Sequence, residues 1–130
     1  MDAIAARPKV LLADDDGLVR DIVHEELEEA GYEVVAVGTG KEALPALESD
    51  ATFIGLVTDI NFGGPPAGWE VATRAREINP AIAVVYMTGD SAPEWSAHGV
   101  PKSTVITKPF APSQIAVALA AQLNTSDGPL

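Results

Sequence analysis

Cysteine is absent from this chain of 130 residues, and histidine occurs only at His24 and His98. The chain therefore has no disulfide framework, thiolate zinc site or cysteine nucleophile, and two histidines alone do not make a histidine-rich metal site. Cations are scarce too, since eight lysines and arginines face nineteen aspartates and glutamates, for a formal net charge of -11. This charge repels nucleic acid and anionic membranes. We expect no nucleic-acid partner, and any metal must be held by oxygen ligands.

Long hydrophobic runs are missing as well. The longest falls far short of the roughly 20 residues that span a bilayer, and no apolar stretch resembling a secretory signal precedes Lys9. We therefore expect a soluble, cytoplasmic protein with no membrane partner. Hydrophobic residues make up 47% of the chain, enough to bury one core. We predict one domain over residues 8–123, with an N-terminal extension over 1–7 and a loose polar tail over 124–130.

Short apolar runs alternate with helical patterns along the chain. The first run ends at three aspartates, as a buried strand does at a polar site, and a helical pattern then continues to the stop at Gly31. A helix capped by Thr39, with Glu42 as its capping-box partner, contains Pro45 and should be bent or short. The predicted strands are 10–13, 33–37, 54–59, 82–87 and 104–107, and the predicted helices are 17–30, 40–49, 69–78, a weak segment around Pro93 and Trp95, and 113–123. This alternation predicts an α/β fold, a doubly wound five-stranded parallel sheet with five helices.

Polar residues follow four of these strands, where ligands bind in such sheets. They are Asp14, Asp15 and Asp16 after the first strand, Asp59 after the third, Thr88 after the fourth and Lys108 after the fifth. Clustered carboxylates repel one another unless a divalent cation neutralises them, and hard oxygen ligands favour Mg²⁺. A lysine and a hydroxyl beside them suit the oxygens of a phosphoryl group. We interpret Asp16 as a helix cap and predict phosphoryl transfer at this edge.

These motifs resemble the receiver domain of bacterial two-component response regulators. The resemblance covers roughly residues 9–123 and is carried by the acidic pair Asp14-Asp15, VTDIN around Asp59, YMTGD around Thr88 and TKPF around Lys108. It implies a flavodoxin-like fold in which Asp59 accepts a phosphoryl group from a phosphohistidine. The donor would be a histidine kinase or a histidine phosphotransfer protein.

The resemblance also implies a role for each site residue. Mg²⁺ would be held by Asp15, Asp59 and the backbone carbonyl of Asn61, with Asp14 acting partly through water. Thr88 would hydrogen-bond the phosphoryl group and Lys108 would pair with it. Docking of the phosphodonor is expected beside the site, on the apolar residues Val19, Ile22, Pro109 and Phe110.

Two departures from the family pattern bear on signalling. Val105 stands three residues before Lys108, where the family usually has an aromatic residue that rotates, and the loop after Asp59 is one residue longer than usual. We therefore expect the signal to be a change in order or position of the weak segment 89–100, which carries Trp95.

The sequence indicates the class of the phosphodonor but not the protein that receives the signal. With no output domain after Leu123, we expect a stand-alone regulator that contacts an unknown downstream protein or serves as a phosphoryl shuttle or sink. The last helix, SQIAVALAAQL, is apolar on more than one face, which suggests a weak homodimer or only the helix propensity of alanine.

Two other functions compete with this interpretation. The segment Asp14-Asp15-Asp16-Gly17 also fits the start of a haloacid-dehalogenase-type phosphatase, whose nucleophile lies on the first strand. That family needs a further acidic pair after its lysine, and here only Asp127 follows Lys108. The third reading is a receiver-like interaction module that is never phosphorylated. We expect no enzymatic activity beyond phosphotransfer to the chain itself and autodephosphorylation.

Overall fold

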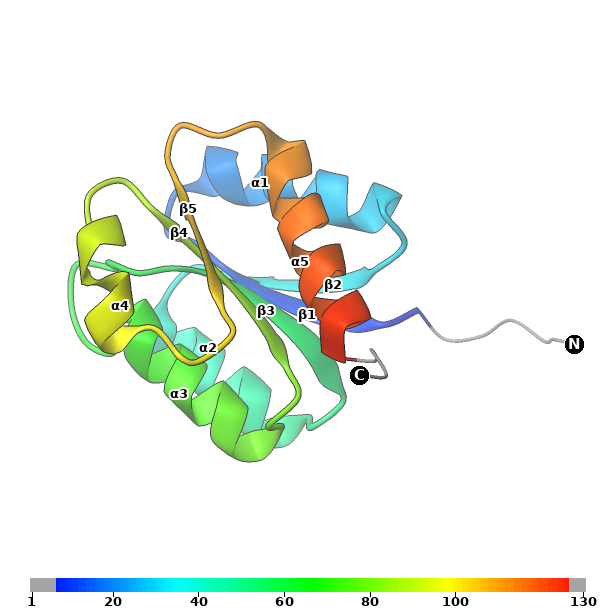
Figure 1. The fold of residues 1–130 in the computed structure, drawn as a ribbon, viewed down its shortest axis with the longest axis horizontal. Helices are drawn as coiled ribbons and strands as arrows, with labels where there is room; N and C mark the ends of the chain where they lie inside the picture. Colours follow the sequence, from blue (N-terminus) through cyan, green and yellow to red (C-terminus); the bar gives the residue numbers. More distant parts are fainter. Residues whose placement is uncertain (1–6, 127–130) are drawn as a thin grey trace, which may run out of the picture.

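One parallel sheet organises the chain, with helices on both of its faces (Figure 1). The computed structural model describes residues 7–126, so most of the predicted N-terminal extension and residues 127–130 lie outside the described part. The strand order is β2-β1-β3-β4-β5, and every neighbouring pair is parallel. The strands are β1 Lys9–Ala13, β2 Glu33–Val37, β3 Phe53–Asp59, β4 Ala83–Thr88 and β5 Thr104–Thr107. The predicted doubly wound α/β fold is confirmed.

A helix follows each of the five strands. The helices are α1 Gly17–Glu29, α2 Gly40–Ser49, α3 Gly68–Ile78, α4 Trp95–His98 and α5 Pro112–Ser126, with a 3-10 turn η1 Ala92–Glu94 before α4. Asp16 caps α1 as predicted, because its Oδ1 accepts hydrogen bonds from the backbone N–H groups of Leu18 and Val19. The segment around Pro93 is as weak as expected, since it forms only two short turns. Among the described residues, no helix is long and apolar enough to cross a membrane.

One detail around α2 differs from the prediction. Glu42 does not close a capping box on Thr39, because its Oε1 accepts a hydrogen bond from the backbone N–H of Gly38 at 2.8 Å. Helix α2 has the predicted bounds Gly40–Ser49, with Pro45 inside it. Proline removes one backbone donor, and the buried Ala43 and Leu47 keep the helix packed on the sheet around it.

Some element boundaries also differ. Helix α5 continues three residues past Leu123, so residues 124–126 belong to the helix and not to the predicted tail. Strand β4 begins one residue later than predicted and ends at Thr88 itself. Helix α1 stops at Glu29, and Gly31 follows at φ 108°, a left-handed conformation that favours glycine.

The alternation of side chains along β1 explains how both faces are covered. Leu11 and Ala13 pack toward α2 and α3, whereas Val10 and Leu12 pack toward α1 and α5. All four side chains are buried, as expected for a parallel strand between two helical layers. Because β1 has β2 on one side and β3 on the other, the chain order reverses there, and the carboxyl ends of β1 and β3 flank a natural ligand site.

Candidate functional site

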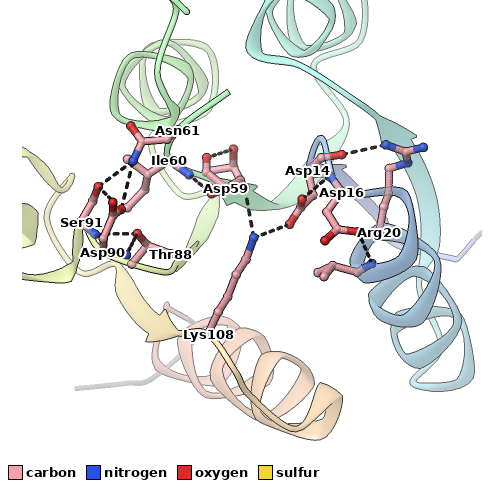
Figure 2. Close-up of polar contacts among 12 residues, drawn as sticks. Asp14, Asp16, Arg20, Asp59, Ile60, Asn61, Thr88, Asp90, Ser91 and Lys108 are labelled. Atoms are coloured by element: carbon pink, nitrogen blue, oxygen red, sulfur yellow. Dashed lines mark hydrogen bonds and ion pairs between the residues drawn. The ribbon is translucent and has the colours of Figure 1, made fainter. Parts of the chain in front are cut away.

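The carboxylate of Asp14 lies at the carboxyl end of β1 and has no solvent exposure. Its Oδ1 accepts a hydrogen bond from the backbone N–H of Asp16 at 2.8 Å (Figure 2). Its Oδ2 lies 3.2 Å from the Lys108 ammonium, yet among the described residues it is the buried side-chain oxygen that receives no hydrogen bond. Burial raises the pKa of this carboxyl, and the nearby charge of Asp59 raises it further.

Asp59 ends β3 directly beside Asp14. Its Oδ1 accepts a hydrogen bond from the backbone N–H of Ile60 at 2.7 Å, and its Oδ2 accepts one from Lys108 Nζ at 3.1 Å. Its side chain keeps only 10% of its surface exposed. Both oxygens are thus held in place at the carboxyl end of β3.

Asp15 completes a cluster of three carboxylates. One oxygen from each of Asp14, Asp15 and Asp59 can be chosen so that all three lie within 4.8 Å of one another. Lys108 is the cation paired with this cluster among the described residues. Three carboxylates facing one ammonium, with a buried oxygen that accepts no hydrogen bond, fit a divalent cation with oxygen ligands. The donor set therefore suits Mg²⁺.

Lys108 reaches the cluster from the end of β5 and points between Asp14 and Asp59 (Figure 2). Burial alone would lower the pKa of its ammonium, but the charges of Asp59 and Asp14 outweigh burial and raise the pKa above 10.5. Its backbone N–H donates to the carbonyl of Thr88 at 2.8 Å, which joins the ends of β5 and β4. The lysine is therefore charged, and it is held in place by its backbone hydrogen bond as well as by the ion pairs of its side chain.

The Thr88 hydroxyl lies at the end of β4 and is almost fully buried. Its Oγ1 accepts hydrogen bonds from the backbone N–H of Ser91 at 2.8 Å and of Asp90 at 3.3 Å. A hydroxyl that accepts from two amides still has its own proton to donate. Any displacement of this hydroxyl also acts on the loop whose amides it holds.

Sequence reasoning missed a polar bridge between two loops. Asn61, predicted to act only through its carbonyl, uses its side-chain Nδ2 to donate to Ser91 Oγ at 2.8 Å and to Asp90 Oδ1 at 3.3 Å. The bridge joins the loop after β3 to the loop after β4 (Figure 2). Only the polar residues following Thr88 hinted at it. Arg20 was missed too, and its Nη1 donates to the backbone carbonyl of Asp14 at 2.8 Å.

The loop after Asp59 is packed tightly through glycines. A Cβ on Gly68 would lie 2.2 Å from the carbonyl oxygen of Asp59, and one on Gly40 would lie 2.4 Å from that of Pro66. Real Cβ atoms do not approach so closely, so both positions need glycine for space. The loop is thereby fixed between the site and the start of α2.

The residues predicted to dock the phosphodonor differ in their exposure. Ile22 is 43% exposed and Pro109 is exposed, but Val19 and Phe110 are partly buried against the core. Leu18, which the sequence analysis did not single out, is 70% exposed. The exposed apolar residues in these segments are therefore Leu18 and Ile22 on α1 and Pro109 after β5.

Comparisons with known proteins agree on one family. The family model described as the response regulator receiver domain matches residues 10–120. The response regulator receiver protein CpdR of Brucella abortus is 36% identical over 106 residues, covering 78% of this chain and 85% of CpdR. The transcriptional regulatory protein YvrH of Bacillus subtilis is 30% identical over 118 residues, which cover 88% of this chain. This chain spans about half of the length of YvrH, 48%. A crystal structure of a response regulator receiver protein from Sinorhizobium medicae aligns with a TM-score of 0.89 at 42% identity, covering 92% of this chain and 97% of that one.

Proposed function

This chain belongs to the response regulator receiver family, and from that premise we propose that Asp59 accepts a phosphoryl group from the phosphohistidine of a histidine kinase or histidine phosphotransfer protein. The observation that carries the proposal is the position of Asp59. Its carboxylate lies at the carboxyl end of β3, 3.1 Å from Lys108 and beside the acids Asp14 and Asp15. The test is to treat the chain with Mg²⁺ and a small phosphodonor and to weigh the intact protein, which should gain one phosphoryl group.

The proposed step is an in-line displacement at phosphorus. A carboxylate oxygen of Asp59 forms the new O–P bond while the N–P bond of the donor breaks, and the leaving imidazole nitrogen keeps the electron pair. Lys108 then pairs with phosphoryl oxygens in place of the Asp59 carboxylate, and the Thr88 hydroxyl donates a hydrogen bond to one of them. The chain modifies only itself, so we propose no other enzymatic activity.

Mg²⁺ is the proposed cofactor. Asp15, Asp59 and the carbonyl of Asn61 would hold it, with Asp14 contributing partly through water. When bound, the ion supplies positive charge that offsets the phosphoryl oxygens and the three carboxylates. The raised pKa of Asp14 and its Oδ2, which accepts no hydrogen bond, support this assignment.

Asp15→Asn should weaken Mg²⁺ binding by roughly tenfold or more, because it removes one of very few charged ligands. The measurement is a Mg²⁺ titration followed by calorimetry or by amide shifts near the site. Asp16→Asn is the matched control, since it changes the adjacent acid while asparagine can still cap α1. Equal Mg²⁺ affinities for Asp15→Asn and wild type would remove Asp15 from the metal site.

Docking of the phosphodonor on α1 is also proposed. Leu18→Glu and Ile22→Glu should slow phosphotransfer from the cognate kinase by roughly tenfold or more, because each replaces an exposed apolar side chain of α1 with a charge. Labelling by a small phosphodonor, which needs no docking surface, should stay at the wild-type rate.

Val117→Glu is the control for docking, because Val117 is 67% exposed on α5 outside the proposed docking surface. Transfer as fast as wild type in both α1 variants would place the donor elsewhere. We also propose that the chain passes the signal on by contact with a downstream protein.

A further inference from the structure

The aromatic residue missing from β5 has a counterpart on the neighbouring strand. Tyr86 of β4 is paired in register with Val105 of β5 and has no solvent exposure. Because Tyr86 and Thr88 are two residues apart on one strand, their side chains point to the same face of the sheet. Tyr86 and Val105 pack in the same core cluster, on the side of α3 and α4. A large aromatic side chain therefore occupies this layer from β4.

Tyr86 is also a hydrogen-bond anchor for the segment that leads into β5. Its hydroxyl oxygen accepts a hydrogen bond from the backbone N–H of Val100 at 3.1 Å. The carbonyl of Val100 accepts one from Ser103 Oγ at 2.5 Å, and Ser103 Oγ accepts one from Trp95 Nε1 at 2.9 Å. The backbone N–H and the carbonyl of Val100 are thus both hydrogen-bonded to side chains. Of these two side chains, only that of Tyr86 comes from the central sheet.

The ring of Tyr86 is itself held on its other side. It meets the Trp69 ring of α3 edge to face, with the ring centroids 4.7 Å apart. A buried ring packed between a strand and a helix has little room to rotate. Tyr86 is therefore a fixed point, unlike an aromatic residue that swings between two positions.

The other end of the segment is tied to β4 at a different atom. Ser91 and Asp90 donate their backbone N–H groups to the Thr88 hydroxyl, so the start of the segment follows that hydroxyl. Between the two anchors lie only the turn η1 and the single turn α4. Such short turns carry little stability of their own and respond to a small displacement.

We propose that Tyr86 converts a displacement of Thr88 into release of Val100. When Thr88 moves toward a phosphorylated Asp59, it draws residues 90–91 with it. The fixed Tyr86 cannot follow, so the hydrogen bond between Tyr86 and Val100 weakens. This inference rests on the proposed phosphorylation of Asp59. It deepens that proposal by naming the contact through which the site regulates the surface of Trp95 and residues 92–103. The readout is loss of a hydrogen bond to β4 and not rotation of an aromatic side chain on β5.

Amide hydrogen exchange at Val100, measured on the full chain with Mg²⁺ and with or without beryllofluoride as the phosphoryl mimic, tests the proposal. In wild type, the mimic should speed exchange at Val100 by roughly tenfold, the equilibrium effect of one lost hydrogen bond. Tyr86→Phe removes the hydroxyl while keeping the ring against Trp69. This variant should exchange fast at Val100 without the mimic and show no further change with it.

Tyr32→Phe is the matched control, because Tyr32 packs in the other core cluster, on the α1 side of the sheet. It should respond to the mimic as wild type does. Amide shifts at Ile60, whose N–H donates to Asp59, report separately whether the mimic occupies the site. If Ile60 shifts while Val100 exchange stays constant, or if Tyr86→Phe still responds like wild type, the Tyr86 proposal is wrong. If Ile60 does not shift, the proposed function fails and the Tyr86 proposal falls with it.

Discussion

Asp59→Asn should carry no stable phosphoryl group after incubation with a phosphorylated histidine kinase and Mg²⁺, under conditions in which wild type carries one. An amide is not the nucleophile that a carboxylate is, so the substitution removes the proposed acceptor. The side chain keeps its shape, and its oxygen can still accept the hydrogen bond from the Ile60 N–H. Intact-mass measurement and retention of radiolabelled phosphate both report the loss.

The fold of Asp59→Asn should survive. The variant removes one of three clustered carboxylates, so repulsion toward Asp14 falls and the free energy of unfolding should stay level or rise modestly. Circular dichroism and denaturant unfolding check this point. Retention of a full label by a folded Asp59→Asn would count against Asp59, unless mapping placed that label on a neighbouring acid acting as a substitute.

Lys108→Met should lower the free energy of unfolding by roughly 3 kcal/mol at neutral pH without Mg²⁺. Methionine fills a similar volume but leaves the fully buried Asp14 and the nearly buried Asp59 without their cation. Lys41→Met is the matched control, because Lys41 is exposed at the start of α2 and forms no ion pair with another described residue. Urea unfolding of the two variants separates loss of this ion pair from loss of a lysine as such.

The loss of unfolding free energy in Lys108→Met is called the deficit here, and its pH dependence distinguishes a lost charge from lost packing. The pKa of Asp14 is raised in the folded protein, mainly by burial, so its charged form opposes folding above that pKa and the penalty disappears as the pH falls below it. Without Lys108 the pKa of Asp14 should rise further. The deficit of Lys108→Met should therefore shrink as the pH falls from neutral toward that pKa, and Mg²⁺ should also reduce it. A deficit that changes with neither pH nor Mg²⁺ would indicate lost packing alone.

The fold and the acidic cluster were predictable because parallel strands bring their carboxyl ends to one edge. Asp14, Asp59, Thr88 and Lys108 each follow an apolar run, so topology alone places them together. No knowledge of side-chain packing is needed for that conclusion. The capping role of Asp16 was predictable for a similar reason, because it depends only on local chain geometry.

The exposed face of α1 could not be predicted as reliably. Leu18, Val19, Ile22 and Val23 are all apolar, and two adjacent stripes of a helix fit this pattern equally well. Packing against the sheet buries Val23 and partly buries Val19, which leaves Leu18 and Ile22 outside. The rotation of a helix about its axis depends on tertiary packing and not on the local sequence.

The polar bridges depend on loops and on distant segments. Asn61 meets Ser91 because the glycine-rich loop after β3 follows one particular path, and Tyr86 meets Val100, which is fourteen residues further along the chain. Within its continuous apolar strand, Tyr86 gave no sign that its hydroxyl would hold a backbone amide. Contacts of this kind follow from the folded geometry, so the sequence reveals the residues but not their partners.

The most direct test of the proposed function is to map the phosphoryl group itself. Wild-type chain treated with Mg²⁺ and a small phosphodonor is reduced with borohydride, which converts an aspartyl phosphate into homoserine, and the modified residue is located by peptide mass spectrometry. Modification at Asp59 is the predicted result. Modification at Asp14 would support the phosphatase alternative, and a fully folded chain without any modified aspartate would contradict phosphorylation altogether.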